Sequence, residues 1–171
     1  MLKVSLMPTG EPEIFRSIQG EGVSAGVPAV FVRLTSCNLT CTWCDTRYTW
    51  DWDKFRYADE MIAMSSPEVE RIITKFQCRR VVITGGEPML QQNELVPLVA
   101  SLAADGYCNE VETNGTIAPK RGLAQVVSQW NVSPKISSSG NRTDRREVPE
   151  ALAAFRDMDK AYFKFVVVEP R

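Results

Sequence analysis

The sequence predicts an α/β protein built on a mostly parallel sheet. Short apolar runs rich in β-branched residues alternate along the chain with segments whose apolar residues recur at helical spacing. Strands that alternate with helices are typical of parallel sheets with right-handed crossovers. With 171 residues, 44% of them hydrophobic, the chain has the size and composition of one globular domain. We therefore expect a single domain over residues 1–171.

The first predicted elements surround a segment of unusual composition. The run VFVRL over residues 30–34 has the β-branched and aromatic character of a strand. Residues 47–66 are rich in aromatic and charged side chains, and we expect an extended loop or an irregular helical insert there. A helix should begin near Pro67. The apolar run RRVVI then predicts a strand that ends in glycines, and residues 93–106 show helical spacing and a glycine stop.

The second half of the chain continues the alternation of strands and helices. The run NEVETNG is predicted as a strand that ends in an Asn-Gly turn. The later predicted elements are a helix over 121–130, a short strand over 131–135, a helix over 148–158 and a final buried strand over 161–169. In such folds the chemistry gathers beyond the carboxyl ends of the strands. The motifs CNLTCTWC, TGGEP, ETNG and SPK each follow a predicted strand, so we expect them at one edge of the sheet.

The charge balance and the N-terminal sequence argue against several classes of protein. Lysine and arginine number 20 and aspartate and glutamate 21, which gives a formal net charge of -1. This balance supplies no general field that attracts a polyanion, so nucleic acid is not expected as a partner. The first residues lack the features of a signal peptide, and no segment approaches the about 18 apolar residues of a membrane-spanning helix. We expect a cytoplasmic protein without a membrane partner.

Three of the five cysteines lie within eight residues, in a chain that has no histidine. Cys37, Cys41 and Cys44 have the spacing C-x3-C-x2-C, and three thiolates in one loop can hold three irons of a [4Fe–4S] cluster while the fourth iron stays open. A zinc site is the alternative, and its fourth ligand would be Cys78, Cys108 or a carboxylate. Inert packing or a redox thiol is a further alternative. Outside such a site, Cys78 and Cys108 are expected to be small buried residues.

The cysteine motif and the glycine motif together resemble the signatures of the radical S-adenosylmethionine (SAM) superfamily. Trp43 stands just before the last cysteine, and TGGEP over residues 84–88 is similar to the second motif of these enzymes. The resemblance implies a partial (β/α) barrel of radical SAM type with a mostly parallel sheet. It also implies that the open iron binds the amino and carboxylate groups of SAM, which is cleaved to methionine and a 5′-deoxyadenosyl radical.

A longer set of motifs resembles the 7-carboxy-7-deazaguanine synthase family. The motifs EIFRSIQGEG, GVPAVFVRLTSCNLTCTWCDT, TGGEPMLQ, ETNGT, SPK and KFVV run in this order over nearly the whole chain. The family consists of carbon–nitrogen lyases that convert 6-carboxy-5,6,7,8-tetrahydropterin to 7-carboxy-7-deazaguanine with loss of ammonia, on the path to queuosine. The resemblance implies a homodimer and an electron donor such as flavodoxin or ferredoxin. Another radical SAM activity, such as activation of a glycyl-radical enzyme, stays an alternative, as does a noncatalytic zinc-binding module.

The resemblance implies cofactor-binding roles for side chains at several motifs. Gly85 and Gly86 would present backbone groups to the methionine end of SAM, and a carboxylate and an amide from ETNG would bind its ribose hydroxyls. The expected cofactor-binding residues are Trp43, Gly85, Gly86, Glu87, Glu112, Asn114, Ser133 and Lys135. No catalytic side chain is expected, because SAM and the cluster carry the radical chemistry.

The expected substrate-binding residues are Gln19, Glu21, Arg33, Thr84 and Gly86. Gln19 and Glu21 can read the amide and amino edge of a pterin, and the guanidinium of Arg33 suits its carboxylate. The resemblance implies that the hydroxyl of Thr46 binds a Mg2+ that also holds the substrate. Without the resemblance, Thr46 would be interpreted as a capping residue.

Simpler structural interpretations stay open for other residues of this set. Glu87 could cap the helix that follows it, and Asn114 could form an ordinary Asn-Gly turn. Arg33 could form a salt bridge at the end of its strand, for example with Glu21. Trp43 could be a buried structural tryptophan instead of a residue near the adenine or the cluster.

Two features depart from the family pattern. Ser36 stands where family members usually have glycine before the first cysteine. The loop tolerates serine if the backbone angle is ordinary, because only a positive φ demands glycine. Related enzymes also continue past KFVV with residues that help to close the substrate pocket, whereas this sequence stops at Arg171. We therefore expect either that the pocket closes differently or that the chain binds SAM without turning over the substrate.

Overall fold

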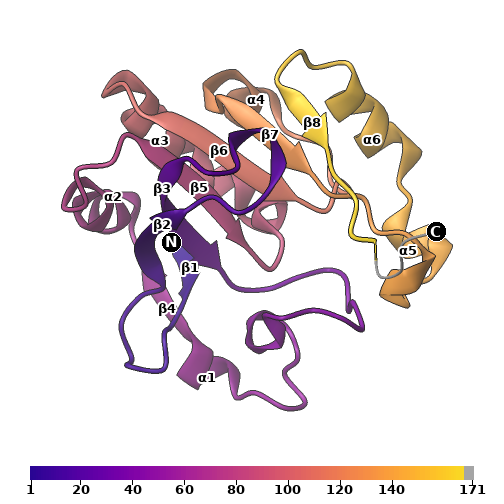
Figure 1. The fold of residues 1–171 in the computed structure, drawn as a ribbon. Helices are drawn as coiled ribbons and strands as arrows, with labels where there is room; N and C mark the ends of the chain where they lie inside the picture. The colour runs from indigo at the N-terminus through magenta and orange to yellow at the C-terminus, as the bar shows by residue number, and fades with distance from the viewer. Residues whose placement is uncertain (168–171) are drawn as a thin grey trace.

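The fold is an open α/β sheet with helices packed on one face (Figure 1). A computed structural model describes residues 1–167. The strands are β1 (Leu2–Ser5), β2 (Ile14–Ile18), β3 (Pro28–Leu34), β4 (Met61–Met64), β5 (Arg80–Gly85), β6 (Cys108–Thr113), β7 (Gln129–Val132) and β8 (Ala161–Phe163). The α-helices are α1 (Tyr57–Glu60), α2 (Ser66–Thr74), α3 (Gln92–Ala104), α4 (Arg121–Val126), α5 (Thr143–Arg146) and α6 (Pro149–Arg156). Short 3-10 helices are η1 (Gly22–Ser24), η2 (Arg47–Thr49), η3 (Pro88–Gln91) and η4 (Ser137–Ser139).

The sheet is mostly parallel, which confirms the predicted fold class. Its strand order is β4-β1-β3-β5-β6-β7-β8, and β2 also pairs with β3. Strands β3, β5, β6, β7 and β8 pair in parallel, whereas β1, β2 and β4 are antiparallel additions. The described strands form an open sheet, with β4 and β8 at its ends. The parallel registers bring the carboxyl ends of β3, β5, β6 and β7 to one edge, as the motif positions predicted.

The segment 47–66 is only partly the irregular insert that the sequence predicted. It contains the short helices η2 and α1, but residues 61–64 form β4, which pairs with β1. The sequence of β4 is MIAM, and two of its four side chains are exposed. A run of four apolar residues shows no alternation of apolar and polar side chains, so the sequence alone does not indicate a strand. The strand is defined by its pairing with β1, which is far away in the sequence. The helix expected near Pro67 is α2, whose Ser65 and Glu68 form a capping box.

Two other predicted elements have different bounds in the structure. The helix predicted over 121–130 ends at Val126, because residues 129–132 pair with β6 as strand β7. The final strand covers only residues 161–163, and two of its three side chains are exposed because it lies at the end of the sheet. It is therefore not the buried strand that the sequence predicted. Val168 and Glu169, which that prediction included, lie outside the described residues.

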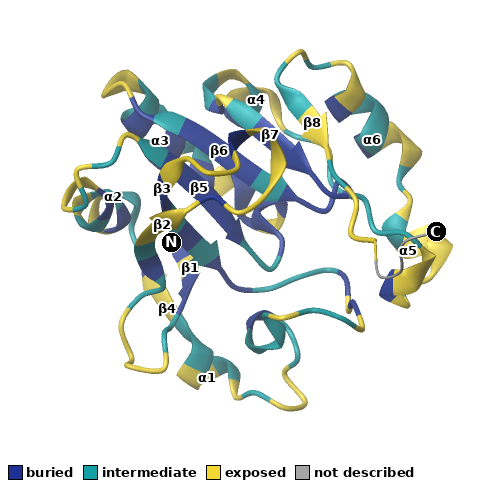
Figure 2. Cartoon of the chain, in the orientation of Figure 1, coloured by how far each residue is buried: buried dark blue, intermediate teal, exposed yellow. Residues whose placement is uncertain are grey.

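The hydrophobic core lies between the sheet and its helical layer (Figure 2). Helix α3 packs between α2 and α4, and its side chains Leu95, Leu98, Val99 and Leu102 are fully buried. Trp130 of β7 packs edge to face on Phe155 of α6, with ring centroids 5.3 Å apart. This core fixes the central strands, so their carboxyl ends form a rigid base for the loops that follow them. No helix in the described part of the chain is long and apolar enough to cross a membrane.

The opposite face of the sheet is covered by the loop between β2 and β3, which contains QGEG and η1 (Figure 1). Residues Glu110 and Glu112 of β6 alternate with Val111, which belongs to the core, so their side chains lie on this loop-covered face. The loop makes hydrogen bonds to both carboxylates. A polar layer is therefore built on the side of the sheet away from the helices.

Candidate active site

Two adjoining cavities lie at the carboxyl edge of the parallel strands. The first, of about 140 Å³, is lined by the three clustered cysteines and by residues of TGGEP, ETNG and SPK. The second, of about 310 Å³, is lined by residues of QGEG, by Arg33 and by Phe31. The residues common to both are Asp45, Thr46, Thr84, Gly85 and Glu112. Apart from Glu87, which lines neither cavity, the residues expected to bind SAM and those expected to bind the pterin thus line neighbouring cavities with a common wall.

The cysteine loop leaves β3 through an unusual backbone position. Ser36 has a φ of 73°, in the left-handed region that favours glycine. The condition under which the loop would tolerate serine, an ordinary backbone angle, is therefore not met. The conformation is fixed by two backbone hydrogen bonds: the N–H of Ser36 donates to Thr49 O at 2.7 Å, and Ser36 O accepts from the N–H of Glu87 at 2.8 Å. The start of the cysteine loop is thus tied to both the TGGEP loop and the η2 segment.

The two glycines of TGGEP are required by backbone packing. A Cβ on Gly85 would overlap the backbone of Leu34, and a Cβ on Gly86 would overlap Ser36 O. Gly85 also has a φ of 120°, which side-chain-bearing residues rarely adopt. The N–H of Gly86 donates to Leu34 O at 2.9 Å. Both glycines also line the first cavity. Because they have no side chains, the two loops can pack closely and the cavity wall stays open.

Two thiols of the first cavity, Cys37 and Cys41, have raised pKa values as long as they hold no cation. Burial raises the pKa of the Cys37 thiol to about 12. Burial also raises the pKa of Cys41, against the opposing charge of Lys135. A cationic iron centre supplies the charge that keeps such thiols deprotonated. Three soft sulfur donors around one cavity therefore suit an iron–sulfur cluster.

The zinc alternative requires a fourth ligand beside the three clustered cysteines, from Cys78, Cys108 or a carboxylate. Cys78 precedes β5 and Cys108 begins β6, so both lie at the amino edge of the sheet, away from the cysteine loop. Both are only half-buried, whereas the sequence predicted buried residues. Neither is placed to complete a site with the three clustered thiols.

Glu87 connects two loops and does not line either cavity. Its fully buried carboxylate accepts hydrogen bonds from the N–H of Met89 at 3.0 Å, from Thr113 Oγ1 at 2.8 Å and from the N–H of Asn114 at 2.6 Å. Burial raises the pKa of this carboxyl, against the effect of these donors. The capping interpretation is confirmed, since Glu87 caps η3. Contact between Glu87 and a cofactor stays a prediction.

Asn114 forms both a turn and part of the cavity wall. Its Oδ1 accepts from the N–H of Thr116 at 3.0 Å, which confirms the turn interpretation. Its Nδ2 donates to Asn38 Oδ1 in the cysteine loop at 2.9 Å. The ETNG turn is therefore fixed against the cysteine loop by a side chain that the sequence did not single out, Asn38.

Lys135 is a half-buried cation at the first cavity. Its Nζ donates to Ser133 Oγ at 3.0 Å and lies 5.4 Å from the ring centroid of Trp43. Burial lowers the pKa of Lys135, partly offset by the nearby Cys41. Trp43 lines the same cavity, and its Nε1 is buried without a hydrogen-bond partner among the described residues. Trp43, Ser133 and Lys135 thus form one wall beside the cysteines.

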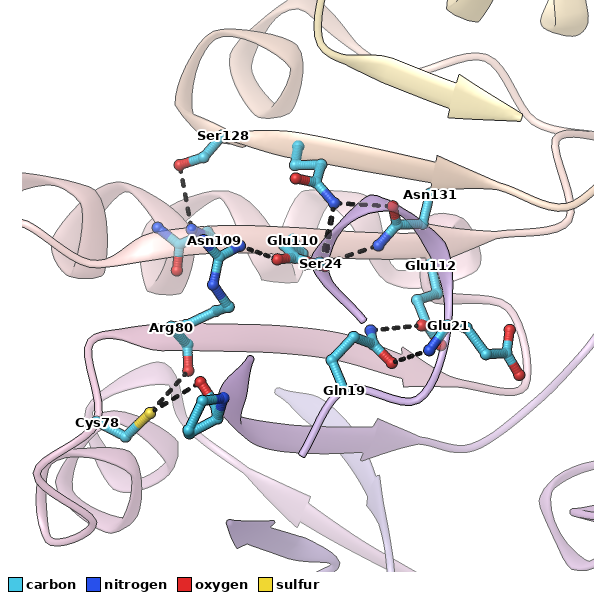
Figure 3. A network of polar contacts seen from close by, with 12 residues as sticks. Gln19, Glu21, Ser24, Cys78, Arg80, Asn109, Glu110, Glu112, Ser128 and Asn131 are labelled. Carbon is cyan, nitrogen blue, oxygen red and sulfur yellow. Dashed lines mark hydrogen bonds and ion pairs between the residues drawn. The ribbon is translucent and has the colours of Figure 1, made fainter. Parts of the chain in front are cut away.

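Glu112 is the link between the two cavities (Figure 3). Its Oε1 accepts from Gln19 Nε2 at 3.0 Å, and its Oε2 accepts from Thr84 Oγ1 at 2.6 Å. Gln19 Oε1 in turn accepts from the N–H of Glu21 at 3.2 Å. The predicted substrate-binding residues Gln19 and Thr84 are therefore bonded directly to a predicted cofactor-binding residue. The Glu21 side chain points away from this group and pairs with Lys164.

A second carboxylate fixes the far end of the QGEG loop (Figure 3). Glu110 is completely buried and forms an ion pair with Arg80. It also accepts from Ser24 Oγ at 2.8 Å and from Asn131 Nδ2 at 3.0 Å. The sequence did not identify this network, because Glu110 resembles any polar residue in an alternating strand.

Arg33 lines the second cavity and forms its salt bridge with a residue other than Glu21. Its Nε donates to Glu13 Oε1 at 2.7 Å, and Tyr48 OH donates to the same carboxylate at 2.9 Å. Glu13 is next to β2, and its backbone O accepts from the N–H of Arg33. The partner was missed because the antiparallel β2–β3 pairing was not predicted.

Thr46 stands where the two cavities meet. It directly precedes η2, without a side-chain cap bond, and its Oγ1 lies 3.6 Å from Cys44 Sγ. Its neighbour Asp45 also lines both cavities. Oxygen atoms are therefore available at this point, and binding of Mg2+ there stays a prediction.

The fold and the thiol site define an iron–sulfur protein, and comparison with known proteins agrees. The sequence model of the 4Fe-4S single cluster domain matches residues 18–131. The chain therefore belongs to the 4Fe-4S single cluster domain family.

Comparison with individual proteins gives more specific similarities than the family model. The chain is 42% identical over 161 residues to the 7-carboxy-7-deazaguanine synthase of Pyrobaculum aerophilum, covering 91% of this chain and 65% of the relative. It is 36% identical over 143 residues to that of Escherichia coli K12, covering 75% of this chain and 61% of the relative. The crystal structure of QueE from Escherichia coli matches with a TM-score of 0.59 and 27% identity over 95% of this chain and 82% of that one.

The resemblance that the motifs predicted is confirmed by these matches. The chain spans less than two thirds of the length of these curated relatives, with 65% and 61% covered.

Proposed function

We propose that the chain is a radical SAM lyase that converts 6-carboxy-5,6,7,8-tetrahydropterin to 7-carboxy-7-deazaguanine with loss of ammonia. The observation that carries this proposal is the pair of adjoining cavities with Glu112 in their common wall. One cavity holds the three cysteines, and the other holds the polar groups that suit a carboxypterin. A reaction that starts on a cofactor and acts on a second molecule needs this adjacency.

In the first cavity, Cys37, Cys41 and Cys44 would hold a [4Fe–4S] cluster. When bound, the cluster and SAM supply an electron and a carbon-centred radical, which is chemistry that no side chain can provide. The backbone at Gly85 and Gly86 gives SAM access to the cavity wall. The polar wall of Asn114, Ser133 and Lys135 suits the ribose and the carboxylate of SAM.

In the second cavity, the side chains would orient the pterin. The Nε of Arg33 is bonded to Glu13, and its two terminal nitrogens make no hydrogen bond within residues 1–167, so they are available to a substrate carboxylate. The Gln19 amide is held by Glu112 and by the Glu21 backbone, so it is rigid before the substrate arrives. Thr84 lines both cavities and forms the floor toward the cofactor side, whereas Gly86, the other residue expected there, lines only the first cavity.

The proposal includes components that rest on the family resemblance. They are a Mg2+ ion at Thr46, a homodimer, an electron donor such as flavodoxin or ferredoxin, and a cytoplasmic location. The position of Thr46 between the two cavities supports the Mg2+ ion, because an ion there could contact the substrate.

Anaerobic turnover tests the proposed function. The protein is reconstituted with iron and sulfide, supplied with reductant, SAM, Mg2+ and 6-carboxytetrahydropterin, and the products are identified by mass. We expect 7-carboxy-7-deazaguanine, and none from the Cys37→Ala variant. Formation of 5′-deoxyadenosine without this product would favour another radical SAM activity. Neither product from cluster-loaded protein would contradict the proposal.

A further inference from the structure

Each sulfur of the cysteine motif has one N–H donor within hydrogen-bond distance. The N–H of Leu39 lies 3.4 Å from Cys37 Sγ and belongs to the cysteine loop itself. The other two donors are side chains from separate segments. Asn141 Nδ2 lies 3.3 Å from Cys41 Sγ, and Trp50 Nε1 lies 3.2 Å from Cys44 Sγ. These two side chains have no assigned role in binding SAM or the substrate.

The orientation of the Asn141 amide is determined by its other contacts. Its Oδ1 accepts from the backbone N–H of Thr40 at 2.9 Å, so this atom has to be the oxygen and the one near the sulfur the nitrogen. The loop after η4 is further fixed because the N–H of Thr42 donates to Ser139 O at 3.0 Å. A Cβ on Gly140 would lie 2.6 Å from Thr42 Cγ2, which shows how closely the two loops pack.

Trp50 is held by the other side of the cysteine loop. Its indole nitrogen can only donate a hydrogen bond, so in this contact Nε1 is the donor and Cys44 Sγ is the acceptor. Its backbone N–H donates to Arg47 O at 3.0 Å and closes η2. The preceding residue, Thr49, accepts from the N–H of Ser36 at 2.7 Å. The indole is therefore anchored to the same loop that carries the thiol.

We propose that Trp50 and Asn141 are positioning residues that tune the reduction potential of the bound cluster. One-electron reduction adds one negative charge to the cluster and its thiolates. The positive end of an N–H dipole at a ligand sulfur stabilises this added charge, and hydrogen bonds to sulfur are among the factors that set cluster potentials. Both donors therefore raise the potential and make the cluster easier to reduce. This inference rests on the cluster of the family, and it is independent of the identity of the substrate.

The test is a redox titration of variants that lose one donor each. Trp50→Phe keeps the aromatic ring and removes the N–H. Asn141→Asp keeps an oxygen for the Thr40 N–H and replaces the donor at Cys41 with an oxygen. The matched controls are Trp52→Phe, an exposed tryptophan two residues away, and Asn93→Asp on the surface of α3. Each protein is reconstituted anaerobically, and its midpoint potential is measured from the signal of the reduced cluster in electron paramagnetic resonance.

We expect a more negative midpoint potential in both donor variants, and the wild-type potential in both controls. The shifts should add in the double variant, because the donors act on different sulfurs. The signal reports only protein that carries a cluster, so a variant with lower loading still gives its potential. Wild-type or more positive potentials in both Trp50→Phe and Asn141→Asp would overturn the proposal.

Discussion

Replacing Glu87 tests how the two central loops of the site are held together. Its carboxylate accepts three hydrogen bonds, from the N–H groups of Met89 and Asn114 and from the hydroxyl of Thr113. Glu87→Ala leaves all three buried donors without a partner and opens a cavity. An unsatisfied buried donor costs about 1–3 kcal/mol, so the loss should be at least about 3 kcal/mol. For a chain of this size, that lowers the melting temperature by about 6–12 °C.

The variant Glu87→Gln keeps the volume of the side chain while it removes the charge and one acceptor oxygen. The amide oxygen can still accept from Met89 and Thr113, which both bond to Oε1, while the amide NH2 then faces the N–H of Asn114. We expect a loss of about 1–3 kcal/mol, smaller than in Glu87→Ala. The assay is anaerobic thermal unfolding of the reconstituted protein in the absence of SAM, with Glu94→Gln as a surface control. If both Glu87 variants melt at the wild-type temperature, Glu87 does not hold the loops together.

Three further predictions concern backbone packing and the QGEG loop, and each is checked by thermal unfolding. Ser36→Gly removes the strain of a positive φ on a serine and should stabilise the protein by about 1 kcal/mol; a lower melting temperature would contradict the assigned strain. Gly86→Ala places a Cβ against Ser36 O and should cost about 3 kcal/mol, whereas Gly122→Ala, which meets only ordinary contacts, should be neutral or stabilising. Ser24→Ala removes a hydrogen bond to the buried Glu110 and should cost about 1.5–2 kcal/mol, compared with no change for Ser17→Ala on the exposed side of β2.

The parts of the site that lie directly after strands could be predicted from the sequence. The alternation of strands and helices determined where TGGEP, ETNG and SPK would meet, since parallel strands end at one edge. The expected substrate residues Gln19 and Thr84 are found on one shared carboxylate, Glu112. To predict this part of the site, local sequence patterns and the rule that parallel strands end at one edge of the sheet were sufficient.

The contacts that fix the site depend on pairs of residues far apart in the sequence. Asn141 and Cys41 are separated by 100 positions, and no local pattern marks an asparagine as a donor to sulfur. The partner of Arg33 is Glu13, which the antiparallel pairing of β2 with β3 brings beside it. The positive φ of Ser36 results from packing of the cysteine loop against Thr49 and Glu87. Tertiary contacts of this kind override what a serine favours by itself.

An anaerobic crystal structure of the reconstituted protein with SAM and 6-carboxytetrahydropterin would test the central claim most directly. The account predicts a [4Fe–4S] cluster on Cys37, Cys41 and Cys44 with SAM in the first cavity. It predicts the pterin in the second cavity, between Gln19 and Arg33, across the wall formed by Glu112. A single metal ion on the cysteines, or a pterin bound away from Gln19 and Arg33, would contradict it.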